Sequence, residues 1–232
     1  MPLVLRRRAE EVLEHMDDPA CDRQRLENTY ANFRWVNGWF AAWHRVYRDY
    51  LRPRLEPHRL NTLLDVGFGG GDVPKRLLRW AERDGLQLAI TAIDIDARAI
   101  AYARSQPLPP GLGVRHVSTR DLAEQGERFD LVISNHLLHH LNADTLADIC
   151  DDTRRLAARL VLHNDIARSD LAYLGFALAT GPLFPRSFIT ADGLRSIRRS
   201  YTAAELARAA PEGWTVDTVA PYRLLLTYTH DA

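Results

Sequence analysis

The stretch LDVGFGGGD, residues 64–72, decides how the rest of the chain is interpreted. It follows the apolar run LNTLLDVGF (60–68), which predicts a buried strand, and it precedes VPKRLLRWAERDG (73–85), which predicts an amphipathic helix. Glycines at a turn from strand to helix let the backbone bend tightly and approach a ligand, because no Cβ stands in the way. The stretch therefore predicts a ligand-binding loop at one edge of a sheet.

The sequence around this loop alternates between strand-like and helix-like segments. Further strands are predicted at residues 86–95, 113–118, 129–135 and 158–166, and further helices at residues 97–105 and 142–157. Apolar strands separated by helices are typical of a parallel sheet that is covered on both faces. The fold class is therefore predicted to be α/β and Rossmann-like.

The class of ligand follows from two acidic positions. Asp94 ends the second predicted strand, where a carboxylate can accept hydrogen bonds from the ribose of an adenosine. The glycines do not fit the dinucleotide pattern G-x-G-x-x-G, since its third glycine, counted from Gly67, would fall on Asp72. A carboxylate at a helix N-terminus repels a pyrophosphate but tolerates an ammonium or sulfonium group. The ligand is predicted to be an adenosine derivative that carries a positive charge.

Three motifs in this order resemble those of class I S-adenosylmethionine-dependent methyltransferases. They are LLDVGFGGGD (63–72), ITAIDIDARAIAYAR (90–104) and FDLVISNHLLHHL (129–141), and the resemblance runs from about residue 61 to 166. It implies a seven-stranded, mostly parallel sheet whose last strand, from residues 222–230, is antiparallel. It also implies S-adenosylmethionine as cofactor, held by Asp65, Gly67, Gly69, Gly71, Asp94, Ile95 and Asn135. Members often contact the adenine just past the third strand, where Thr119, Arg120 and Asp121 are the candidates here.

The segments HNDIARSDLAYLGFAL (163–178) and DGLRSIRRSYTAAEL (192–206) carry a narrower resemblance, to methyltransferases of quinone biosynthesis and of polyketide pathways that have an N-terminal helical cover. It implies a cover over residues 1–56 and a core over residues 57–232, with an insert at about 167–200 that closes over the acceptor. Asp18-Pro19 offers a helix start, and no proline interrupts residues 23–51. Trp35, Trp39 and Trp43 would then form one stripe on a single helix, which either docks on the core or roofs the pocket.

Histidines at two strand ends are the candidates for a general base, because deprotonation of an acceptor is most often done by histidine or a carboxylate. His139 and His140 follow the fourth strand, where they either face the cleft or serve in packing and capping. His163 and Asp165 end the fifth strand and point to the same side of it, since alternate strand residues share a face. They form a catalytic pair or else anchor the insert.

The acceptor is predicted to be small and aromatic or polyketide-derived. Trp39, Tyr173 and Phe176 would line an apolar pocket. Arg195 would bind an acidic group of the acceptor, or lie on a solvated helix face with Arg198 and Arg199. A turn is expected at Asp192-Gly193.

Composition excludes several classes of protein. The 232 residues include 30 basic and 30 acidic ones, so the basic surplus of a nucleic-acid-binding protein is missing. The two cysteines, Cys21 and Cys150, form no zinc motif, and no other metal site is expected. Neither a secretory signal nor an apolar run of membrane-spanning length is found, so a cytoplasmic location is expected. An exposed aromatic helix would also suit a homodimer.

Together these features predict an S-adenosylmethionine-dependent enzyme that methylates a small acceptor at oxygen with a His/Asp base. Methylation at carbon or nitrogen is the first alternative. A protein that binds the cofactor without catalysis is the second, because a fold does not prove a chemistry. An NAD-dependent oxidoreductase is disfavoured by the glycine spacing.

Overall fold

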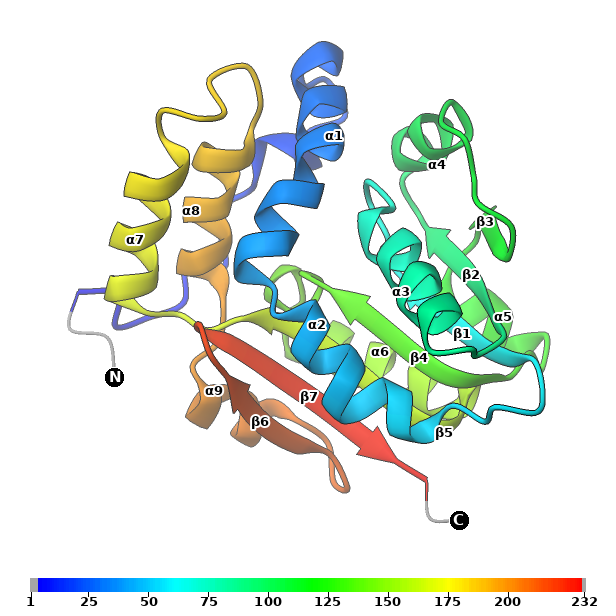
Figure 1. Cartoon of the computed structure of the whole chain (residues 1–232). Coiled ribbons are helices and arrows are strands. Elements are labelled where there is room, and N and C mark those ends of the chain that lie inside the picture. Colours follow the sequence, from blue (N-terminus) through cyan, green and yellow to red (C-terminus); the bar gives the residue numbers. More distant parts are fainter. Residues whose placement is uncertain (1–3, 231–232) are drawn as a thin grey trace.

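The computed structural model describes residues 4–230, which form a sheet with helices on both faces and a helical layer beyond one edge (Figure 1). The sheet has seven strands in the order β3-β2-β1-β4-β5-β7-β6. Their bounds are β1 Asn61–Val66, β2 Leu88–Asp94, β3 Leu112–His116, β4 Phe129–Asn135, β5 Ala157–Ile166, β6 Thr215–Val219 and β7 Arg223–Thr229. The predicted α/β fold and seven-stranded sheet are confirmed.

Strand direction divides the sheet into two parts. β1 to β5 pair in parallel, whereas β7 runs antiparallel to both β5 and β6, as predicted for the last strand. Strand order reverses between β1 and β4, so the loops that follow these two strands leave in different directions. Ligands of open α/β sheets bind in the crevice at such a reversal, outside the carboxyl ends of the strands.

Helices cover both faces because the central strands β1, β4 and β5 are apolar on both sides. One face packs against α2 Trp43–Val46, α3 Asp72–Arg83 and α4 Ala97–Arg104, and the other against α5 Thr119–Glu124, α6 Ala143–Leu156 and α9 Ala203–Ala209. In β1 the neighbours Leu63 and Leu64 are both buried but belong to the cores of opposite faces. This double burial holds the strand ends, and hence the site, in fixed positions.

The N-terminal helix differs from the prediction of one helix over residues 23–51. Helix α1 spans Arg23–Phe40, with Asp22 as its N-cap rather than Asp18, and it stops at Ala42, which has a left-handed backbone. The chain resumes as α2, a π-helical turn (Tyr47–Leu51) and a 3-10 turn (Arg52–Arg54). The tryptophan stripe is therefore broken: Trp43 is buried in the core, whereas Trp39 is 50% exposed. The prediction failed because periodicity does not reveal a kink at two alanines.

A layer of helices lies beyond the carboxyl ends of the strands. α1 stands beside α8 (Ile189–Arg199), and α8 beside α7 (Asp170–Thr180), as Figure 1 shows. Residues 192 and 193, expected to form a turn, lie within α8. Across residues 4–230, no helix has both the length and the apolar composition that crossing a membrane requires.

Candidate functional site

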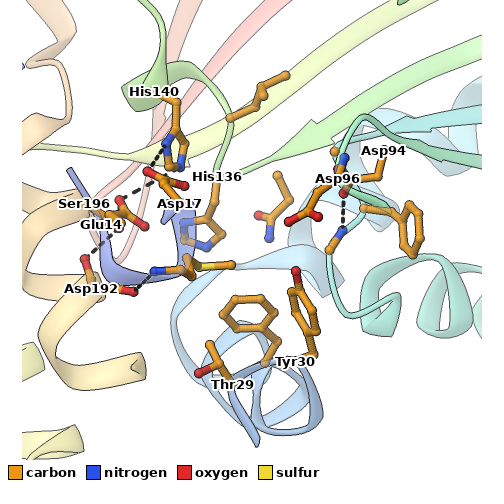
Figure 2. Close-up of a pocket in the computed structure, with 18 of the residues that line it drawn as sticks. Glu14, Asp17, Thr29, Tyr30, Asp94, Asp96, His136, His140, Asp192 and Ser196 are labelled. Carbon is orange, nitrogen blue, oxygen red and sulfur yellow. Dashed lines mark hydrogen bonds and ion pairs between the residues drawn. The ribbon is translucent and has the colours of Figure 1, made fainter. Parts of the chain in front are cut away.

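A cavity of about 740 Å³ opens where the sheet edge meets the helical layer. The loops after β1, β2 and β4 line one end, and residues from the N-terminal segment, α1, α7 and α8 line the other. This volume is in the range of pockets that enclose small ligands. Figure 2 shows the carboxylates and histidines that face it from both ends.

The glycine-rich loop builds the first end. Gly69 has a φ of +54°, a conformation that favours glycine. A Cβ on Gly70 would lie 2.6 Å from the carbonyl oxygen of Tyr30, so glycine is what allows α1 to approach the loop. Gly67 and Gly69 line the cavity, whereas Gly71 caps the start of α3 outside it.

Asp94 holds this loop in place from the end of β2. One carboxylate oxygen accepts a hydrogen bond from the Gly69 amide (3.1 Å), and the other from the Asp96 amide (2.9 Å). Burial raises the pKa of Asp94. The neighbouring Ile95 also lines the cavity and is 76% exposed. Both residues predicted at this strand end therefore face the cavity.

Asp65 lies beneath the loop with no internal partner. It is fully buried, and neither carboxylate oxygen has a hydrogen bond to any residue within 4–230. Burial, together with the nearby carboxylates of Asp72 and Asp94, raises its pKa to about 8. A buried, unpartnered carboxyl beside two others fits a cationic ligand and opposes a phosphate. The residues at this end therefore fit a sulfonium cofactor that also carries an ammonium group.

Asn135 ends β4, and its side-chain amide is hydrogen-bonded to residues of three other elements. Its amide oxygen accepts from Trp43 Nε1 (3.1 Å) and from Arg223 Nη2 (3.3 Å), and its amide nitrogen donates to Asn37 Oδ1 (3.2 Å). Asn135 lines the cavity, as predicted, with its orientation fixed by three neighbours.

The three candidates for the adenine contact lie outside the cavity. Asp121 closes a capping box with Ser118 at the start of α5. Thr119 donates to Asp152 (3.1 Å), and Arg120 forms ion pairs with Asp148 and Asp152. All three side chains serve the first turn of α5 and its packing on α6, so a contact with adenine through Thr119 or Arg120 would have to come from the backbone.

At the other end of the cavity, His139 is paired with carboxylates on both sides. Its Nδ1 lies 2.7 Å from Asp165 Oδ1, and its Nε2 lies 3.2 Å from Glu14 Oε1. Burial alone would lower the pKa of His139, but Asp165 and Glu14 outweigh it and raise this pKa to about 9. The His/Asp pair of the site is therefore His139 with Asp165.

His163 is not part of that pair, contrary to the prediction. Its ring contacts Ser134 Oγ (2.7 Å) and Thr153 Oγ1 (3.3 Å) and stacks on Trp214, away from the cavity. Residues two apart on a strand lie roughly 6.6 Å apart, so sharing a face does not bring their side chains into contact. Burial lowers the pKa of His163 to about 4, which keeps its ring neutral.

The N-terminal segment brings residues that the sequence did not single out. Asp17 Oδ2 lies 3.4 Å from His140 Nδ1, and Glu14 accepts a hydrogen bond from Ser196 in α8 (2.7 Å). Asp192 in α8 accepts from the amides of His15 (2.8 Å) and Met16 (3.0 Å). Glu14 and Asp17 lie among other acidic residues before α1, and nothing in their spacing in the sequence marks them as part of a site.

Of the predicted acceptor contacts, Phe176 alone lines the cavity. Trp39 packs against Phe184, and Arg195 donates to the carbonyl of Leu13 (2.7 Å), so both lie outside it. Tyr173 is half-buried on α7, also outside the cavity. Other apolar residues in the wall include Tyr30, Phe33 and Val36 of α1 together with Ile189 of α8.

Comparison with known proteins places this site in a family. Residues 63–159 match the model of a methyltransferase domain. A ubiquinone biosynthesis O-methyltransferase of a Methylobacterium species is 30% identical over 186 residues, which cover 76% of this chain and 67% of that protein. The ubiquinone biosynthesis O-methyltransferase of Paramagnetospirillum magneticum is 34% identical over 44% of this chain, but the match spans only 39% of that protein.

Solved structures share the fold at low sequence identity. Human N-acetylserotonin methyltransferase, in complex with S-adenosylmethionine, superposes with a TM-score of 0.61 at 12% identity, covering 91% of this chain and 57% of that one. The plantazolicin methyltransferase BpumL superposes with a TM-score of 0.59 at 12% identity, covering 94% and 93%. Both likenesses support the Rossmann-like methyltransferase fold.

Proposed function

The chain belongs to the class I S-adenosylmethionine-dependent methyltransferases, and from this premise we propose that it methylates a hydroxyl group of a small aromatic or polyketide-derived acceptor. The observation that carries the proposal is the single cavity that joins the glycine loop and Asp94 to a cluster of histidines and carboxylates. When bound, the cofactor supplies an electrophilic methyl group, because the methyl carbon is attached to a positively charged sulfonium sulfur.

At the cofactor end, Asp94 would accept hydrogen bonds from the ribose, and Asp65 would lie near the charged groups of the methionine part. Because Gly67 and Gly69 have no Cβ, the cofactor could approach the backbone of this loop closely. Asn135, whose amide is held by Trp43 and Asn37, separates this end from the histidines. Such positioning can supply about 7–11 kcal/mol of the barrier to methyl transfer.

At the acceptor end, Phe176, Phe33 and Val36 offer an apolar wall for an aromatic ring. A hydroxyl on that ring would lie against Glu14, His139 and His140, where its proton is lost before the oxygen attacks the methyl carbon. His140 thus remains the candidate base that takes this proton, whereas His139, with a pKa of about 9, already carries a proton near neutral pH and would position the hydroxyl. Oxygen is favoured as the methylated atom because the curated relatives are named as O-methyltransferases.

We assign the cover to three segments. Residues 14–17, helix α1 and the helices α7 and α8 supply the wall that faces the acceptor. Residues 14–17 contact α8 through Asp192 and Ser196. Arg98 ties this wall to the cofactor side, because it donates to the carbonyl of Met16 (2.9 Å) and pairs with Asp96.

The proposal is tested in two steps. Calorimetric titration should show binding of S-adenosylmethionine and none of NADH, and binding should be lost in Asp94→Ala. Turnover is then measured with a panel of hydroxylated aromatic compounds, with the product analysed by mass spectrometry and NMR. A methyl group on oxygen supports the proposal, one on carbon or nitrogen changes the acceptor atom, and cofactor binding without turnover of any acceptor indicates a non-catalytic protein.

A further inference from the structure

Three side chains at the acceptor end converge in a way that an apolar pocket does not require. Glu14, His139 and His140 each place one oxygen or nitrogen so that all three atoms lie within 4.8 Å of one another. The Glu14 Oε1 atom is 3.2 Å from His139 Nε2 and 3.9 Å from His140 Nε2. In a tetrahedral zinc site with bonds of about 2.0–2.1 Å, neighbouring ligand atoms lie roughly 3.3 Å apart.

Both imidazole rings are held from behind by a carboxylate. His139 Nδ1 lies 2.7 Å from Asp165, and His140 Nδ1 lies 3.4 Å from Asp17. Each carboxylate favours the proton on Nδ1, which leaves the Nε2 lone pair free to face Glu14. Metal-binding histidines have this same support, because a partner on the other ring nitrogen fixes the tautomer and strengthens the ligand.

The second sign of a ligand is an unsatisfied atom. His139 Nε2 is buried without a hydrogen bond to any residue in the described chain, although its side chain is only 1% exposed. It lies close to Glu14 but not in line for a hydrogen bond. A buried polar atom without a partner is costly, and in a native protein it points to an absent ligand or to a function.

We propose that Glu14, His139 and His140 bind a divalent first-row transition ion such as Zn²⁺, with its open positions facing the cavity. Two imidazoles and one carboxylate suit such ions better than Mg²⁺, which prefers oxygen ligands. Three protein ligands leave room for a further one, as in catalytic rather than structural zinc sites.

The role of this ion rests on the proposed function. It would hold the acceptor hydroxyl and lower its pKa, so that the proton passes to water. The acceptor oxygen then bonds to the methyl carbon while the carbon–sulfur bond breaks, and the electron pair of that bond stays on sulfur. Without the ion, His139 is protonated between two carboxylates, and its second proton lies on Nε2, which faces Glu14. Metal binding to Nε2 must displace this proton.

The test uses the full chain without a histidine tag, treated with a chelator and dialysed. Titration with Zn²⁺ is followed by calorimetry, and Co²⁺ serves as a second probe because four-coordinate Co²⁺ absorbs visible light strongly. We expect one ion per chain with a micromolar or lower dissociation constant. Glu14→Gln and His140→Gln should weaken binding at least ~100-fold, and Asp165→Asn about 10–100-fold.

His58→Gln is the matched control, because His58 is exposed and lies far along the chain from the cluster. It should bind Zn²⁺ as the unaltered chain does. Circular dichroism and titration with S-adenosylmethionine show whether each variant is folded. Equal binding in all variants would place the ion elsewhere and overturn the proposal.

The outcomes separate this proposal from the proposed function. If S-adenosylmethionine binds and acceptors are methylated in the metal-free protein, and Zn²⁺ does not bind, the cluster is an ion-pair network and the metal proposal is wrong. If Zn²⁺ binds at the cluster and S-adenosylmethionine does not bind at all, the metal site stands and the methyltransferase function falls.

Discussion

The two ends of the cavity satisfy their polar groups in opposite ways. At the cofactor end, the Asp65 carboxyl is buried without a hydrogen-bond partner among residues 4–230, and its pKa is raised. At the acceptor end, Asp165 and Glu14 surround His139, and the pKa values of both carboxylates are lowered. The first end stays incomplete until a cationic ligand arrives, whereas the second compensates its own charges. Under the proposed function, charge matching would dominate recognition of the cofactor, and shape and hydroxyl contacts would dominate recognition of the acceptor.

The largest effect is expected from His139→Gln, which removes the cation that pairs with Asp165 and Glu14 at the acceptor end. Leaving Asp165 and Glu14 buried without their cation should lower the free energy of unfolding by about 3–5 kcal/mol. In the metal-free protein the pKa of His139 is about 9, above its unfolded value of 6.5. Its stabilisation is therefore fully present below about pH 6.5 and is lost as the pH rises through 9.

Urea unfolding of both proteins from pH 6 to about pH 10, with a chelator present, measures this difference. The gap in unfolding free energy should shrink as the pH rises. A gap that stays constant across this range would show that His139 is neutral in the folded protein.

Asp94→Asn probes the cofactor end next. It keeps the shape of the side chain but removes the charge that orders Gly69 and would receive the ribose. Charge-assisted hydrogen bonds contribute about 1.5–3 kcal/mol each, so the affinity for S-adenosylmethionine should fall about 100-fold in calorimetry. Asp121→Asn is the control, because Asp121 lies outside the cavity, and its affinity should match that of the unaltered chain.

A smaller effect is expected from protons at Asp65. Its pKa of about 8 keeps most of this carboxyl protonated near neutral pH, and a bound cation lowers that pKa. Binding of S-adenosylmethionine near pH 7 should therefore release up to about one proton. Calorimetry in buffers of different ionisation enthalpy measures this release. Asp65→Asn should abolish it; release that persists in the variant would assign the proton to another group.

The smallest effect concerns the apolar wall. Phe176→Ala should raise the KM for the acceptor several-fold, since a buried phenyl ring contributes about 1.5–3 kcal/mol, and only part of this ring faces the cavity. The affinity for S-adenosylmethionine should not change. Trp39→Ala, which removes an aromatic side chain outside the cavity, should leave both values unaltered. An equal change in both variants would mean that the wall is wrongly assigned.

The parts of the site that lie directly at the ends of strands were predictable from the sequence. The glycine loop follows β1 and Asp94 ends β2, so their placement follows from the alternation of strands and helices. The seven strands and the antiparallel β7 followed from the resemblance to the family, whereas the order of the strands was not predicted. Asn135 was singled out from the sequence because it ends a predicted strand, β4.

The acceptor end was predicted less well because tertiary contacts assemble it. Glu14 and Asp17 come from a segment with little regular structure, and contacts with α8 and with Arg98 hold that segment against the histidines. The pairing of Asp165 with His139 rather than His163 depends on the short helical turn Leu138–His140 after β4, which no strand periodicity describes. The break at Ala42 likewise moved Trp43 from the expected stripe into the core.

The connection from residues 14–17 through Asp192 and Ser196 to α8 joins parts of the proposed acceptor wall that lie beyond the carboxyl ends of the strands. The methyl donor site, by contrast, belongs to the strand ends. Evolution can therefore revise acceptor choice in one part of the chain while selection preserves donor binding in another. A mutant library confined to α7 and α8 should yield new acceptor preferences at little risk to the donor site, which makes this scaffold suited to laboratory diversification.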